Sequence, residues 1–232
     1  MTTSSTFEES RLPRNLIFLA SAWLFLSWIL AIGLHPPLQP SSSVYTPAAR
    51  LLLCSIVIGG TWAWPMLRLS GGIPRRPIRN SLLDWLSLAI LLQILIWPVR
   101  LVTTWTVMRV AIIDSYLCVW LLISAGVIAL SLRAGGIIRS WAMLLLIAWT
   151  TLPHLLGTFP GISSNVILAS PLGQIWQSCS QGAEDPSSES WNRVGIWLVI
   201  ALVIWTLNGI LSMRAGVQNR ISGSQTGEKD EK

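Results

Sequence analysis

Apolar residues dominate the chain in six long stretches, each bounded by charged residues. A helix needs about 20 mostly apolar residues to cross a hydrocarbon core of about 30 Å, so each stretch is a candidate transmembrane helix. The predicted helices cover residues 15–34, 51–67, 82–99, 110–132, 140–157 and 194–213. The sequence therefore predicts an all-α integral membrane protein, with a bundle of six transmembrane helices in the segment 15–213.

The third stretch is the shortest, because its charge-free part holds only residues 85–99, or about 23 Å of helix. Positive charge decides whether it crosses, since arginine and lysine accumulate on the cytoplasmic side. With six spans, twelve of the 16 positive residues lie on one side and four on the other; with five spans the split is nine to seven. This favours six spans with both termini in the cytoplasm. We expect Asp84 and Arg100 to reach out of the membrane from the ends of a short third helix.

The longest connection, the outer loop 158–193, is predicted to contain a short amphipathic helix. Ser170 suits an N-cap, and Pro171 suits the first helical position. The apolar face of this helix suits the outer membrane interface or a cap over the bundle, and it consists of Leu172, Ile175 and Trp176. The tails 1–14 and 214–232 are polar, and we expect both to be cytoplasmic and disordered.

Composition agrees with a chain solvated by lipid. Apolar residues make up 52% of the chain and charged residues only 11%, with a formal net charge of +6 and a mean hydropathy of +0.60. These values exclude an ordinary soluble domain and a disordered protein. The sparse arginines form no basic face for nucleic acid, so the bilayer is the expected partner. The arginine bias and the absence of an Asn-x-Ser/Thr site fit a bacterial inner membrane.

No local signature of nucleotide, dinucleotide, zinc or serine chemistry occurs in the sequence, and we predict no cofactor and no metal. Instead, ionisable residues gather toward the outer leaflet, where they are costly unless paired or hydrated. They are Asp114, Arg100, Arg109 and His154. A structural ion pair between Arg100 and Asp114 is one interpretation, and a substrate, ion or proton pathway is the other.

Two further features concern packing and partners. The connection 71–77 contains two glycines, two prolines and the arginines Arg75 and Arg76, with Arg79 shortly after. These three arginines are candidates for docking a cytoplasmic partner. The plainer interpretation is a hairpin that only sets topology. Small residues at four-residue spacing predict close helix packing; they are Ser55, Gly59 and Ala63.

Six spans, two cytoplasmic termini, a missing nucleotide site and a short outer helix before the last span are similar to the layout of ABC-2-type exporter permeases. The resemblance implies a permease-like subunit of a transport complex, energised by a separate cytoplasmic ATPase and accompanied by other membrane subunits. A non-catalytic membrane scaffold or assembly subunit is the alternative. An intramembrane enzyme or haem protein using His35, His154 and Asp114 is a third hypothesis.

Overall fold

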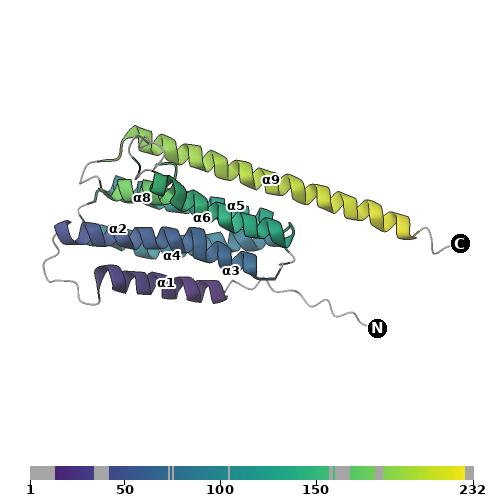
Figure 1. Cartoon of the computed structure of the whole chain (residues 1–232), viewed down its shortest axis with the longest axis horizontal. Helices are drawn as coiled ribbons and strands as arrows, with labels where there is room; N and C mark the ends of the chain where they lie inside the picture. Colours follow the sequence, from purple (N-terminus) through teal and green to yellow (C-terminus); the bar gives the residue numbers. More distant parts are fainter. Residues whose placement is uncertain are drawn as a thin grey trace.

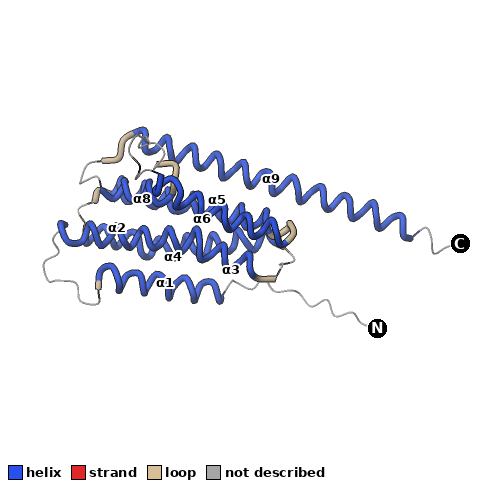
Figure 2. Tube along the Cα trace, in the orientation of Figure 1, coloured by secondary structure: helices blue, strands red, loops and turns tan. Residues whose placement is uncertain are grey.

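The computed structural model describes residues 14–33, 42–72, 74, 76–103, 105–156, 159, 168–180 and 185–227, with only the backbone described for 42–44 and 214–227. Every regular element in these ranges is helical (Figure 2). In chain order they are α1 (Arg14–Ile32), α2 (Ser42–Ile58), the π-helix η1 (Gly59–Ala63), α3 (Trp64–Ser70), α4 (Pro77–Val102), α5 (Val107–Ser131), α6 (Gly136–Leu156), α8 (Pro171–Ser180) and α9 (Ser188–Gly227).

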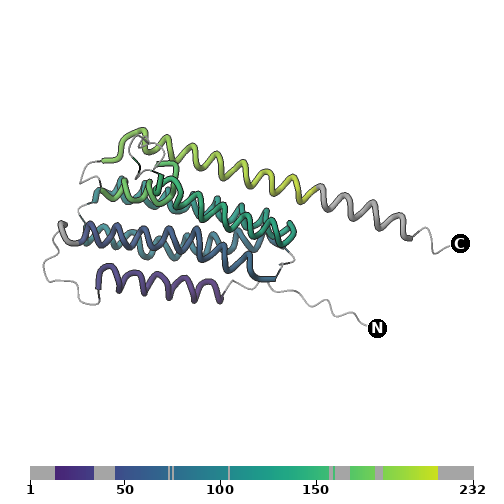
Figure 3. Tube along the Cα trace, in the orientation of Figure 1, coloured from purple at the N-terminus to yellow at the C-terminus, as the bar shows by residue number. Residues whose placement is uncertain are grey.

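Six helical segments are long and apolar enough to cross a membrane, which confirms the predicted number. They are Arg14–Ile32, Tyr45–Ser70, Pro77–Val102, Val107–Ser131, Gly136–Leu156 and Ser188–Met213. Successive spans run in alternating directions (Figure 1). We call the end of the bundle with the α3–α4 connection the hairpin end, and the opposite end the α8 end. By this alternation, α1 starts and α9 finishes toward the hairpin end (Figure 3).

Helix α5 forms the centre of the bundle. In its apolar 18-residue stretch, two thirds of the residues are buried, against 11–44% in the corresponding stretches of the other five spans. Its closest neighbours are α4 and α9. The peripheral helices instead expose large apolar side chains, such as Phe18 (78%), Ile94 (69%) and Val199 (60%). Such extensive apolar exposure marks a surface that faces lipid.

The third span corrects our expectation of a short helix. Helix α4 has 26 residues, or about 39 Å, and it begins well before Asp84. Asp84 does not reach out of the membrane, because its side chain is only 2% exposed and is paired with Arg68 of α3. Charge-free windows underestimate a span when one of its charges is neutralised inside the bundle.

Helix α9 also differs from its predicted span. We expected the last span to end at residue 213 and a disordered tail to begin there, whereas the helix continues to Gly227. No proline occurs between residues 188 and 227 to interrupt the hydrogen-bond ladder.

The second span contains a π-helical turn at the predicted small-residue stripe. The backbone N–H of Trp64 bonds the carbonyl of Gly59, five residues earlier. Pro65 follows at once, and a proline both lacks an N–H and crowds the carbonyl four residues before it. We attribute the π-turn to this proline, since such turns relieve a broken α-helical ladder.

The two glycines of this turn allow close helix contacts. A Cβ on Gly59 would lie 2.7 Å from Nε1 of Trp23 in α1, and a Cβ on Gly60 would lie 2.5 Å from Cδ2 of Leu121 in α5. The hydroxyls of Ser27 and Ser55 also lie 2.7 Å apart. Residues Ser55 and Gly59 of the predicted stripe thus pack against α1.

Several tryptophans connect neighbouring segments through their indole N–H groups. Each donates to a backbone carbonyl of another segment, and a carbonyl that is already bonded within a helix can accept this second hydrogen bond. The pairs are Trp23 to Ser55 (3.2 Å), Trp85 to Cys118 (3.0 Å), Trp149 to Ala169 (3.1 Å) and Trp205 to Leu122 (3.1 Å). These side chains therefore act in the packing of neighbouring segments.

Candidate functional site

The structure does not assemble the four predicted outer residues into one site. The ion pairs recorded among the described residues join neither Arg100 nor Arg109 to Asp114. Asp114 instead accepts a hydrogen bond from Nε2 of Gln93 at 2.8 Å. Gln93 in turn accepts one from Nε1 of Trp97 at 2.7 Å. An amide therefore partners this carboxylate, in a polar chain between α4 and α5.

Arg109 is buried and holds α8 in place. Only 1% of the residue is exposed, and its Nη1 donates to the carbonyl of Ser178 at 2.9 Å. Its backbone N–H is capped by the Thr106 hydroxyl at the start of α5. Arg109 thus lies in the interior of the bundle, although the sequence analysis assigned it to an outer connection.

A second arginine, Arg50 of α2, contacts the same end of α8. Its Nη2 donates to the carbonyl of Cys179 at 3.5 Å, and its guanidinium lies 4.6 Å from the ring centre of Trp176. Two positive side chains at the carbonyl end of a helix interact favourably with its dipole. Burial raises the pKa of the Cys179 thiol, while Arg50 and Arg109 act in the opposite direction.

Arg100 and His154 lie apart from these contacts. Arg100 is exposed in the last turn of α4. Within α6, Nδ1 of His154 is buried without a hydrogen-bond partner. His35, the other histidine of the haem hypothesis, lies outside the described residues. Over the described ranges, no group of three His, Cys, Asp or Glu residues could hold a metal ion.

Helix α8 packs into the bundle against α2, α5 and α6. Ile175 and Cys179 are completely buried, while Trp176 remains 42% exposed. Gln174 is 3% exposed; its Nε2 donates to the carbonyl of Leu168 at 2.6 Å, and its Oε1 accepts from Nε1 of Trp120 at 3.2 Å. The short helix predicted in the outer loop is therefore present as α8. It packs more closely against the bundle than its predicted apolar face alone indicates.

Three tryptophans from three different helices cluster beside α8. The ring centres of Trp120 and Trp197 lie 4.4 Å apart, those of Trp120 and Trp149 lie 4.8 Å apart, and those of Trp149 and Trp197 lie 5.3 Å apart. Such edge and tilted contacts are favourable aromatic geometries. The cluster joins α5, α6 and α9 at the α8 end.

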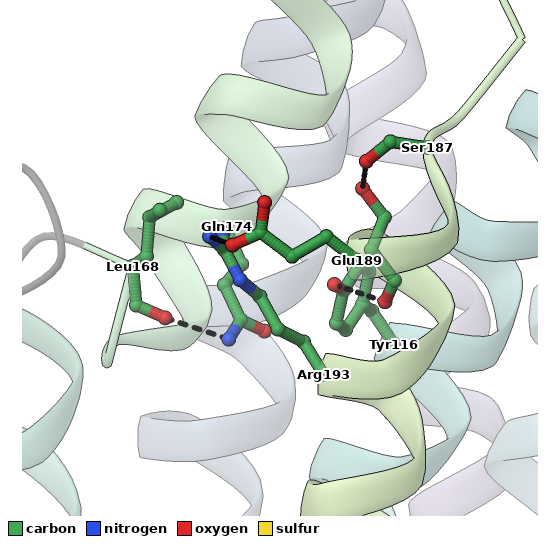
Figure 4. Close-up of polar contacts among 7 residues, drawn as sticks. Tyr116, Leu168, Gln174, Ser187, Glu189 and Arg193 are labelled. Atoms are coloured by element: carbon green, nitrogen blue, oxygen red, sulfur yellow. Dashed lines mark hydrogen bonds and ion pairs between the residues drawn. The ribbon is translucent and has the colours of Figure 1, made fainter.

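Next to this cluster is an open surface pocket of about 310 Å³, which we call the α9 pocket. Glu189 and Arg193, one turn apart on α9, form an ion pair beside it, and Figure 4 shows this pair next to Gln174. The hydroxyl of Tyr116 donates to the Ser190 carbonyl at 2.9 Å and holds the start of α9 against α5. The lining residues are Leu168, Ala169, Gln174, Glu189, Arg193, Ile196 and Trp197.

The hairpin end carries a different polar site. Nε and Nη2 of Arg68 donate to the two carboxylate oxygens of Asp84, in the two-point geometry of a strong arginine–carboxylate pair. Both residues line a cavity of about 120 Å³, together with Gly71, Gly72 and Ser81. The Ser81 hydroxyl oxygen is buried without a partner.

Two of the three candidate docking arginines lie close to this ion pair along the chain. Arg76 immediately precedes α4, Arg79 lies in its first turn, and both are exposed. Arg75 lies outside the described residues. Positive charge near a helix N-terminus opposes the helix dipole by about 0.3–1 kcal/mol per residue, so these arginines do not serve the stability of α4.

The sequence analysis missed the residues of the α9 pocket and the Arg68–Asp84 pair. Glu189 and Arg193 stand at the helical spacing of an ion pair, which is visible in the sequence, although nothing there indicates what they face. The pairing of Arg68 with Asp84 depends on how α3 and α4 are placed in the bundle, which the sequence does not show. Comparison with known proteins gives no match, since no family profile, curated protein or solved structure is significantly similar to this chain.

Proposed function

We propose that this protein is a permease-like subunit of a transport complex in a bacterial inner membrane. In this proposal the hairpin end faces the cytoplasm and binds a separate ATPase. The observation that carries the proposal is the ion pair of Arg68 with the buried carboxylate of Asp84, which joins two spans close to the connection between them.

The ion pair makes the hairpin suitable for transmitting movement. Because Arg68 is 34% exposed, breaking this pair should cost about 2 kcal/mol, less than a fully buried pair. This cost favours movement of α3 together with the start of α4. The π-turn η1 lies immediately before α3, and irregular turns of this kind are where helices bend. A force on the hairpin would therefore turn α3, together with the start of α4, about η1.

The proposed contact with the ATPase is the exposed pair Arg76 and Arg79. Arginine forms two-point hydrogen bonds with carboxylates, so acidic side chains are the expected partner chemistry. Substituting Arg76 and Arg79 leaves the Arg68–Asp84 pair intact, because neither arginine takes part in it.

The test is co-purification of ATPase activity from native membranes in a mild detergent. We expect tagged wild-type protein and the control Arg100→Glu, at the opposite end of α4, to retain a membrane ATPase. The double variant Arg76→Glu and Arg79→Glu should lose it at equal membrane abundance. Wild-type protein without ATPase activity, or undiminished activity with the double variant, would contradict the proposal.

A non-catalytic scaffold is the second candidate, and one observation favours it. Asp114 accepts a hydrogen bond from Gln93 of the neighbouring helix α4, so its carboxylate has a partner in helix packing without any substrate. A scaffold predicts that Asp114→Asn and His154→Ala leave function unchanged. Loss of function from either change at normal membrane abundance would count against this candidate.

A further inference from the structure

We propose that the α9 pocket binds the zwitterionic headgroup of a membrane phospholipid, with the phosphate on Arg193 and the ammonium group on Glu189. This inference does not depend on the proposed transport role. It rests on the hydrogen-bonding capacity of the ion pair, the aromatic wall behind it and the apolar surface that continues from the pocket along α9.

The Arg193 guanidinium has more N–H donors than its hydrogen bond with Glu189 uses. Its guanidinium carries five N–H groups in a fork that matches phosphate oxygens. The recorded side-chain contact is one hydrogen bond from Nη2 to Oε1 of Glu189. The side chain is 27% exposed and lines the pocket, so its remaining N–H groups can reach a bound phosphate.

The negative partner of Arg193 is Glu189, which lies one helical turn away on α9. The Glu189 side chain is 71% exposed, and its Oε2 makes none of the recorded hydrogen bonds. The Trp197 ring lines the same pocket, about two helical turns further along α9, and forms its aromatic wall. Adjacent positive and negative groups match a zwitterion better than a ligand with a single charge.

The surroundings favour a lipid over a free phosphate ester. Ile196 lines the pocket and begins an exposed apolar stripe on α9, with Val199 and Val203 one and two turns further along. Acyl chains can lie along this stripe while the headgroup occupies the pocket. A volume of about 310 Å³ is at the small end of ligand sites, as expected for a headgroup alone.

The test is native mass spectrometry of the purified full-length chain in detergent, titrated with phosphatidylethanolamine or phosphatidylglycerol. We expect wild-type protein and the control Arg100→Gln to bind one phosphatidylethanolamine preferentially. Arg193→Gln should lower this affinity about tenfold, the loss expected for a charge-assisted hydrogen bond. Glu189→Gln should remove or reverse the preference for the amine headgroup.

The unfolding midpoint of each variant in the same detergent identifies any change in folding. Because the Glu189 side chain is mostly exposed, that variant keeps the inference testable even if Arg193→Gln is unstable. Equal lipid binding by Arg193→Gln and Arg100→Gln would overturn the inference. Displacement of the lipid by millimolar inorganic phosphate would also overturn it, because the site would then select a free anion.

Discussion

Arg68 and Asp84 stand 16 positions apart in sequence, on two successive spans, and meet through two parallel hydrogen bonds. Asp84 is almost completely buried, whereas Arg68 is 34% exposed. The pair thus neutralises a carboxylate inside the bundle with an arginine that still reaches the surface. It explains how α4 carries an acidic residue within a membrane-spanning helix.

Replacing Asp84 by Asn should destabilise the protein by about 2 kcal/mol, less than the full cost of breaking a buried pair, because water still reaches Arg68. The thermal unfolding midpoint in detergent measures this effect. The double variant Arg68→Met and Asp84→Leu should recover most of the loss, since it leaves no buried charge without a partner. If the double variant were as unstable as Asp84→Asn, lost packing would explain the effect better than lost charge.

Gly59→Ala should destabilise the contact between α1 and the π-turn. The new methyl group would meet the Trp23 ring at 2.7 Å, and displacing a packed side chain costs about 1–3 kcal/mol. Gly195→Ala is the matched control, because its Cβ would meet nothing within 4 Å. The difference between their unfolding midpoints measures the effect. Equal midpoints would mean that Trp23 moves aside without cost.

Gln174→Leu should loosen α8. The change removes the acceptor of the Trp120 indole N–H and the donor to Leu168, and a buried donor without a partner costs about 1–3 kcal/mol. Hydrogen exchange of residues 171–180 measures the effect, with Gln177→Leu on the exposed side of the same helix as control. Unchanged protection in Gln174→Leu would show that the hydrogen bonds of Gln174 are not needed to hold α8.

The buried Cys179 thiol should make stability fall at high pH. Because burial raises its pKa in the folded state, the unfolded chain releases this proton first, near pH 8.5. The stabilisation by the protonated thiol is therefore complete at neutral pH. It is lost as pH rises above about 8.5, by at most about 1.4 kcal/mol per pH unit. Unfolding midpoints between about pH 7 and pH 10 should fall less steeply for Cys179→Ala than for wild type. Equal slopes would contradict this assignment.

The number of spans could be predicted because it depends on properties that are local along the chain. Length and hydropathy identify a helix that can cross a bilayer, and the short helix after Ser170 has its own capping residues. Helix ends were less predictable, as α4 shows. Asp84 can lie within this helix because its charge is neutralised by Arg68, which belongs to a different span.

The contacts of the polar residues depended on tertiary packing. One interpretation of the sequence paired Asp114 with Arg100, whereas an amide on α4 reaches it. Arg109 contacts a helix 69 positions away, and the tryptophan cluster draws on three spans. Hydropathy identifies which segments enter the membrane, because transfer to lipid acts on each segment by itself. Which side chains meet there depends on how the helices pack against one another, and that is a property of the whole bundle.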